Sequence, residues 1–117
     1  MSVEVNNKLF PVFLKLENFR VLIIGGGKVA HEKVTAVINN SPATKIKLVG
    51  THVSDEIKKL AHSNSNLEIH QRSFVESDLE NTDLLISAIN NKETSLQIKQ
   101  LAQAKGILAN VADTPEQ

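Results

Sequence analysis

A short apolar run that ends in three consecutive glycines constrains the fold of this chain more than any other feature. The run Arg20-Val21-Leu22-Ile23-Ile24 is rich in β-branched residues, and Gly25, Gly26 and Gly27 follow it directly. Such a run is typical of a strand that is buried on both faces of a parallel sheet. Between Val29 and Ile38 apolar residues recur every three or four positions instead, which predicts a helix over about 27–39.

The turn between this strand and this helix has the pattern of a dinucleotide-binding turn. Gly25-Gly26-Gly27-Lys28-Val29-Ala30 matches G-x-G-x-x-[GA], in which Gly25 allows the tight turn, Gly27 lets the backbone approach a pyrophosphate and Ala30 keeps the helix close to the strand. The N–H groups of the first helical turn would face the phosphates. Three glycines can also form a merely flexible turn, but the strand before them and the helix after them favour nucleotide binding. A P-loop is excluded because Lys28 is followed by Val29 and not by Ser or Thr.

The rest of the chain alternates between strand and helix patterns. Strands are predicted over 46–49, 67–70, 84–88 and 107–111, and helices after the N-cap Ser54 and over 92–105, with Gly106 as a C-cap. Alternation of this kind predicts βαβ units with right-handed crossovers. We therefore expect an α/β fold, a Rossmann-type doubly wound parallel sheet of about five strands in the order 3-2-1-4-5, as one domain over residues 1–117.

Composition excludes several classes of protein. Thirteen Lys and Arg balance thirteen Asp and Glu, so the chain has no net charge that would attract nucleic acid or an anionic membrane. The absence of cysteine excludes a disulfide scaffold, a zinc ribbon and a thiol nucleophile. The four histidines show no metal-ligand spacing, so we expect no fixed metal site; they are His31, His52, His62 and His70. Short apolar runs and a polar amino terminus predict a cytoplasmic protein without a membrane partner.

The position that usually binds the adenosine ribose is unusual here. An Asp or Glu about 20 residues after the glycines holds the ribose 2′-OH in most such domains. The predicted second strand ends in Val49-Gly50-Thr51-His52, with neither that acid nor an Arg that would mark a 2′-phosphate pocket. Thr51 and His52 could bind the ribose instead, so this position leaves the choice between NAD and NADP open.

Further candidate site residues lie where the last two strands end. Ligands of open α/β sheets bind outside the carboxyl ends of the strands. The fourth strand ends in residues that would line the nicotinamide side of the crevice, namely Ser87, Ala88, Ile89 and Asn90, unless they form only a strand end and a turn. Asn110 could anchor a loop or the cofactor amide. Asp113 would lie beside the crevice, or would merely begin the turn before Thr114-Pro115.

Taken together, these segments resemble a known family. Leu9-Phe10-Pro11-Val12-Phe13-Leu14-Lys15-Leu16, the glycine turn with its flanking strand, and Lys33 resemble the amino terminus of precorrin-2 dehydrogenases, the NAD-dependent part of sirohaem synthases. Leu85-Ile86-Ser87-Ala88-Ile89-Asn90-Asn91 and Gly106-Ile107-Leu108-Ala109-Asn110-Val111-Ala112-Asp113 resemble the family's fourth- and fifth-strand motifs. The resemblance covers nearly the whole chain from Leu9, and members of the family also commonly lack the ribose acid.

The resemblance implies NAD-dependent oxidation of precorrin-2, a tetrapyrrole, to sirohydrochlorin, and in bifunctional members the insertion of ferrous iron as well. It also implies that Asp113 is the catalytic residue, because the oxidation releases a proton that an ionised carboxylate can accept. Family members continue into dimerisation and helical regions, so we expect this chain to be a cofactor domain that is truncated or dependent on missing segments, that forms a homodimer when full length, and that binds NAD well but catalyses poorly alone. The alternative is a non-catalytic module that senses NAD or NADH.

Overall fold

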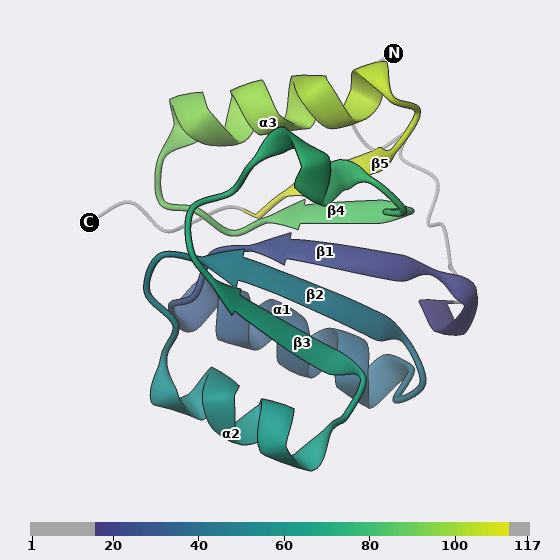
Figure 1. The fold of residues 1–117 in the computed structure, drawn as a ribbon, viewed down its shortest axis with the longest axis vertical. Helices are drawn as coiled ribbons and strands as arrows, with labels where there is room; N and C mark the ends of the chain where they lie inside the picture. The colour runs from purple at the N-terminus through teal and green to yellow at the C-terminus, as the bar shows by residue number, and fades with distance from the viewer. Residues whose placement is uncertain (1–15, 113–117) are drawn as a thin grey trace, which may run out of the picture.

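The computed structural model describes residues 16–112, which form a five-stranded parallel sheet in the order β3-β2-β1-β4-β5 (Figure 1). The strands are β1 (Arg20–Ile24), β2 (Lys45–Gly50), β3 (Leu67–Gln71), β4 (Leu84–Ser87) and β5 (Leu108–Val111). The helices are α1 (Lys28–Asn40), α2 (Asp55–Ser63) and α3 (Lys92–Ala104), with two short 3-10 turns, η2 (Leu16–Asn18) and η3 (Glu76–Leu79). This confirms the predicted fold class and strand order, and the element ends lie within a residue or two of those predicted.

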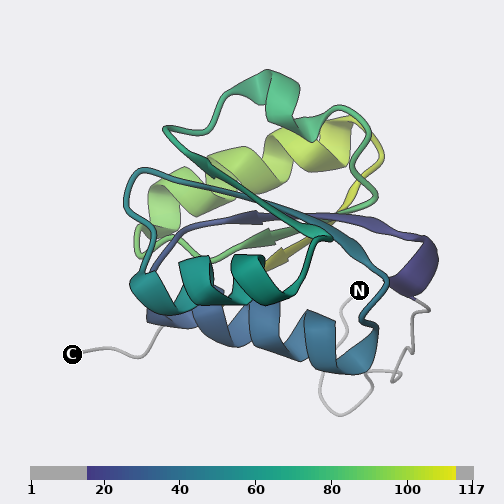
Figure 2. The same cartoon turned by 60° about the horizontal axis from the view of Figure 1, so that its bottom comes forward.

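The sheet is covered on both faces, as the continuous apolar runs require. Helices α1 and α2 lie against one face, and α3 and η3 lie against the other (Figure 2). Because successive side chains of a strand point to opposite faces, Val21 and Ile23 pack in the layer under α1 and α2. Leu22 and Ile24 pack in the layer under α3. All four are nearly or fully buried, so β1 is the centre of both cores.

Local capping explains where two of the helices begin. Ser54 accepts a hydrogen bond from the backbone N–H of Ile57 at 3.3 Å, which confirms the predicted N-cap of α2. Asn91 does the same for the N–H of Thr94 at 2.9 Å at the start of α3. Within residues 16–112, none of the helices has the length and apolar character that a membrane span requires.

The turn η3 was not predicted, because a single 3-10 turn is too short to leave a periodic pattern in the sequence. It carries Asp78, whose side chain is 2% exposed. Asp78 accepts two hydrogen bonds from Arg72 at 2.7 and 2.9 Å, one from the backbone N–H of Val75 at 2.9 Å, and pairs with Lys47 at 3.0 Å. The carboxylate therefore joins β2, the end of β3 and η3.

The Asp78 cluster gives a prediction about acid stability. Hydrogen bonds from Arg72 are the main cause that holds the pKa of Asp78 well below its usual range, against the opposing effect of burial. A lowered folded-state pKa contributes stability above the unfolded value of about 3.9 and loses it as pH falls further. We expect Asp78→Asn to be less stable than the wild type at neutral pH but to lose less stability between about pH 5 and pH 2. Urea unfolding across this pH range measures the free energy of unfolding of both proteins. If that free energy fell equally with pH in the wild type and in Asp78→Asn, the prediction would be wrong.

Candidate functional site

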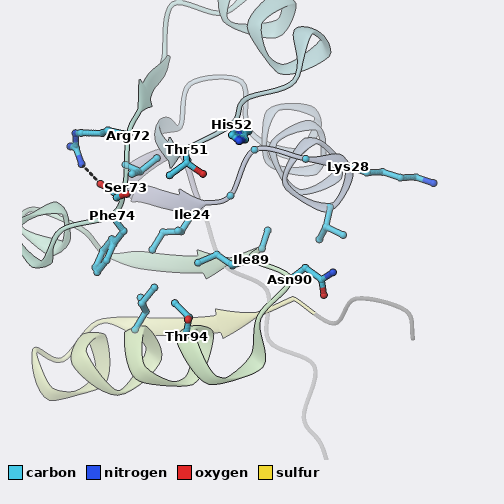
Figure 3. Close-up of a pocket in the computed structure, with 18 of the residues that line it drawn as sticks. Ile24, Lys28, Thr51, His52, Arg72, Ser73, Phe74, Ile89, Asn90 and Thr94 are labelled. Carbon is cyan, nitrogen blue, oxygen red and sulfur yellow. Dashed lines mark hydrogen bonds between the residues drawn. The ribbon is translucent and has the colours of Figure 1, made fainter. Parts of the chain in front are cut away.

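A large cavity opens at the carboxyl edge of the sheet, where the glycine turn, the ends of β2, β3 and β4, and one face of α3 meet (Figure 3). Its volume is about 1100 Å³. The lining residues are Ile24, Gly25, Gly26, Gly27, Lys28, Val29, Glu32, Val49, Gly50, Thr51, His52, Arg72, Ser73, Phe74, Ala88, Ile89, Asn90, Thr94, Gln97, Ile98 and Leu101. This is the place where open α/β sheets bind ligands, and the volume is that of a small-molecule site.

Two of the three glycines are required by the protein's own backbone. Gly25 has a φ of +130°, a conformation that L side chains rarely adopt. A Cβ on Gly26 would overlap the carbonyl oxygen of His52, because the segment after β2 crosses directly over the turn. The backbone N–H of Ser54 donates to the Gly26 carbonyl at 2.9 Å and fixes this crossing.

Gly27 is different, because a Cβ there would meet no protein atom within 4 Å. Gly27 is the N-cap of α1 and lines the cavity, so its missing side chain leaves the entrance to the helix N-terminus open. The first turn of α1 holds no acidic residue and Gly27 gives it no side-chain cap, so its N–H groups and partial positive charge are open to a ligand anion; Glu32, one turn further along, is the acidic residue of α1 that lines the cavity. This geometry fits the pyrophosphate of a dinucleotide.

The structure brings most of the predicted cofactor residues together around this cavity. Those that line it are Gly25, Gly26, Gly27, Lys28, Val29, Thr51, His52, Ala88, Ile89 and Asn90. Ala30 lies beneath the turn, fully buried in the core between β1 and α1, as its predicted packing role requires. Asn110 is exposed on β5 and is not among the lining residues. Asp113 lies outside the described residues.

Ser87 corrects the expectation that all of 87–90 would line the crevice. Its side chain is fully buried, and its hydroxyl lies 2.8 Å from the hydroxyl of Ser95 on α3. The alternation of β4 turns Ser87 into the sheet–helix interface, where a polar group needs a partner. Ser87 therefore joins the end of β4 to α3, beneath the cavity-lining Ala88 and Ile89.

Sequence reasoning missed the contribution of β3 to the site. Arg72, Ser73 and Phe74 follow β3 and line the cavity, and Thr94, Gln97 and Leu101 line it from α3. The strand-end rule could have found Arg72, because β3 lies beside β2 and Gly50 is in register with Gln71. The α3 residues carry no such signal in the sequence, since their approach to the cavity depends on how α3 packs on the sheet. No three His, Asp or Glu side chains within residues 16–112 are grouped so that they could hold a metal ion.

Comparison with known proteins gives relatives that match this architecture. Residues 12–117 match a family model described as "Putative NAD(P)-binding". The chain is 33% identical over 108 residues to the siroheme synthase of Ectopseudomonas mendocina, covering 92% of this chain and 22% of that protein. It is 36% identical over 103 residues to the siroheme synthase of Pseudoalteromonas translucida, covering 88% and 21%. The chain thus spans about a fifth of the length of these curated relatives.

A solved structure shows the same fold. The chain titled SirC, precorrin-2 dehydrogenase, superimposes with a TM-score of 0.73 at 23% sequence identity. The match covers 92% of the present chain and 51% of the SirC chain. The Rossmann-like arrangement of five parallel strands with helices on both faces is therefore shared with that protein.

Proposed function

The chain belongs to the putative NAD(P)-binding family whose model matches residues 12–117, and we propose that it is the NAD-binding domain of a precorrin-2 dehydrogenase. Such an enzyme oxidises precorrin-2 to sirohydrochlorin in sirohaem biosynthesis. The relatives named siroheme synthase and the fold shared with a precorrin-2 dehydrogenase support this proposal. The observation that carries the cofactor part is Gly27, which leaves an open approach to the uncapped N-terminus of α1 beside a large cavity.

The residues around the cavity divide into three groups by the part of the cofactor they would hold. The glycine turn and the first turn of α1 bind the pyrophosphate. Thr51 and His52 lie at the end of β2 and bind the adenosine ribose in place of the missing acid. Ala88, Ile89 and Asn90 lie after β4 and position the nicotinamide ring. When bound, NAD supplies the acceptor for the hydride that precorrin-2 loses.

The proton released in the oxidation needs an acceptor from the protein. We propose Asp113 for this role, since it follows the carboxyl end of β5 by two residues and β5 pairs in register with β4. An aspartate with an ordinary pKa of about 3.9 is ionised at neutral pH and can take the proton. The hydride and the proton together balance the conversion of precorrin-2 and NAD⁺ to sirohydrochlorin and NADH.

The rival function is a module that senses NAD or NADH without catalysis. Such a module needs the pyrophosphate site but no proton acceptor beside the nicotinamide. The family resemblance at 106–113, which ends on Asp113, favours the enzyme. A homodimer of the full-length protein is part of the proposal because of the family resemblance, and a cytoplasmic location is part of it because of the short apolar runs of the sequence.

Titration with NAD tests the cofactor site directly. We expect saturable binding with a Kd between about 1 µM and 1 mM, measured by isothermal titration calorimetry. Incubation of the complete enzyme that contains this domain with NAD and precorrin-2 should then produce the absorbance of NADH and the visible spectrum of sirohydrochlorin. The same assay with added ferrous iron tests the insertion step. A protein that shows no saturable binding up to about 10 mM NAD would contradict the proposal, and binding without turnover would favour the sensing module.

A further inference from the structure

We propose that Arg72 is the adenine-binding residue of this site, its guanidinium plane covering the purine ring, and that the buried Asp78 is the positioning residue that holds it there. This inference rests on the proposed dinucleotide function. It assigns the adenosine half of the site to the segment after β3, in addition to the end of β2.

The position of Arg72 follows from the sheet register. Gly50 at the end of β2 pairs with Gln71 at the end of β3, so Thr51 and Arg72 are the next residues of two neighbouring strands. Both line the cavity, and the side-chain amide of Gln71 donates to the Thr51 carbonyl at 3.4 Å. Since the adenosine ribose of a Rossmann domain lies at the end of β2, the base beyond it reaches the end of β3.

The hydrogen bonds of Arg72 determine which part of it a ligand can contact. Nη1 and Nη2 donate to the two carboxylate oxygens of Asp78 at 2.9 and 2.7 Å, and Nη1 also donates to the Ser73 carbonyl at 3.0 Å. This bidentate pair fixes the plane of the guanidinium and offsets its charge. The Nη1–Nη2 end of the guanidinium is thus held by Asp78, while the side chain is still 41% exposed. Arg72 lines the cavity, and we infer that its guanidinium plane is available to it, a shape that suits stacking on an aromatic base.

The rest of this end of the cavity also suits a flat, apolar ring. Phe74 lies two residues after Arg72, half-buried against the core beneath α3, and Ile98 and Leu101 line the cavity from α3 (Figure 3). Leu101 is 36% exposed and gives this end of the cavity an apolar wall. Arg72 on the rim and apolar groups below it form a slot for adenine.

The fixed orientation of Arg72 depends on Asp78, which does not line the cavity itself. Asp78 is held in turn by the Val75 N–H and by Lys47, so its carboxylate has one position. Loss of Asp78 would leave Arg72 free to swing into solvent, and adenine would then have to order it at an entropic cost.

The test compares ADP, which carries the adenosine, with nicotinamide mononucleotide, which lacks it, by calorimetric titration of wild type and variants. We expect Arg72→Met to lower the affinity for ADP, for NAD and for NADP by about tenfold each. The affinity for nicotinamide mononucleotide should stay within about twofold of the wild-type value. Arg72→Lys should restore little, because an ammonium group has neither the plane nor the bidentate pair. Lys105→Met is the matched control: Lys105 is 43% exposed, pairs with Glu76 on the surface and does not line the cavity, so all affinities should be unchanged.

The positioning role of Asp78 is tested by a double-mutant cycle on ADP affinity. Asp78→Asn should lower the affinity for ADP in the wild-type background. In the Arg72→Met background it should lower that affinity by less than about a further twofold, because both substitutions act on the same contact. Additive losses would overturn the positioning role. If Asp78→Asn does not fold, the Arg72 variants still decide the adenine contact.

Several outcomes overturn the proposal for Arg72. It fails if Arg72→Met leaves ADP affinity unchanged while NAD binds the wild type, and the proposed function then stands. Equal weakening of both mononucleotides would indicate general electrostatic attraction, and a loss confined to NADP would indicate contact with a 2′-phosphate. If the wild type binds neither ADP nor NAD, the dinucleotide site itself is refuted.

Discussion

Replacing Gly27 with alanine is expected to abolish most NAD binding while leaving the fold intact. A Cβ at this position meets no protein atom within 4 Å, so the protein can accommodate it without rearrangement. The added methyl would stand at the N-cap of α1, in the space through which a pyrophosphate must approach the helix N–H groups. Since overpacking costs about 1–3 kcal/mol, affinity for NAD should fall about 10- to 100-fold. Calorimetric titration measures the affinity, and thermal unfolding should give a melting temperature close to that of the wild type.

Gly26→Ala is the matched comparison, because the same methyl one residue earlier meets backbone. It would overlap the His52 carbonyl oxygen and come within 2.9 Å of the Cα of Val53, so the turn and the segment after β2 must separate. We expect a loss of about 3 kcal/mol or more in the free energy of unfolding. The two variants thus distinguish a glycine needed for the fold, Gly26, from a glycine proposed to be needed for the approach of the pyrophosphate, Gly27. If Gly27→Ala bound NAD normally, the proposed pyrophosphate position would be wrong even though the cavity exists.

Asp113→Ala is expected to remove most of the catalytic activity without removing the cofactor. Loss of a general base lowers turnover by about 100- to 10,000-fold. NAD affinity should change by less than about threefold, because the pyrophosphate and adenosine contacts do not involve this carboxylate. The measurement is the rate of sirohydrochlorin formation at saturating NAD and precorrin-2, beside a calorimetric NAD titration of the same preparation.

Two substitutions sharpen the Asp113 experiment. Asp113→Asn keeps the shape of the side chain and removes its basicity, so it should be as slow as Asp113→Ala. Asp113→Glu keeps a carboxylate and should retain more activity than either. If Asp113→Asn turned over within about fivefold of wild type, proton acceptance could not be its role, and Asp113 would only begin the turn before Thr114-Pro115.

The sequence located the edge of the sheet where the cavity opens wherever one strand carried the signal by itself. Residues 25–29, from the glycine motif, and Thr51, His52 and 88–90, from the strand ends, all line one cavity. Ser87 was placed on the wrong side because the strand-end rule names residues but not the face to which each one points. Its alternation relative to Ile86 and Ala88, and the buried hydroxyl of Ser95, turn it into the core.

Arg72 shows what a reading along the chain leaves out. It is 20 residues beyond His52 in sequence, and its place beside Thr51 at the cavity comes from β3 lying beside β2. Its partner Asp78 lies on a single 3-10 turn, which has no periodic pattern that a sequence could reveal. The missing ribose acid could be seen in the sequence, and the strand-end rule could have named Arg72, but its bidentate pair with Asp78 could not be seen.

The sequence by itself determined the parallel sheet, its strand order and the edge at which the cavity opens. Those features follow from hydrophobic period, from glycine and capping residues, and from the handedness of βαβ crossovers, all of which act over short stretches of chain. Only the tertiary structure decided that a Cβ on Gly26 would clash with the His52 carbonyl whereas one on Gly27 would meet no protein atom, that Ser87 is buried, and that Arg72, held by Asp78, lines the cavity with Thr51. The physical reason is that these roles depend on contacts between segments distant in sequence, whose register and packing no local pattern encodes.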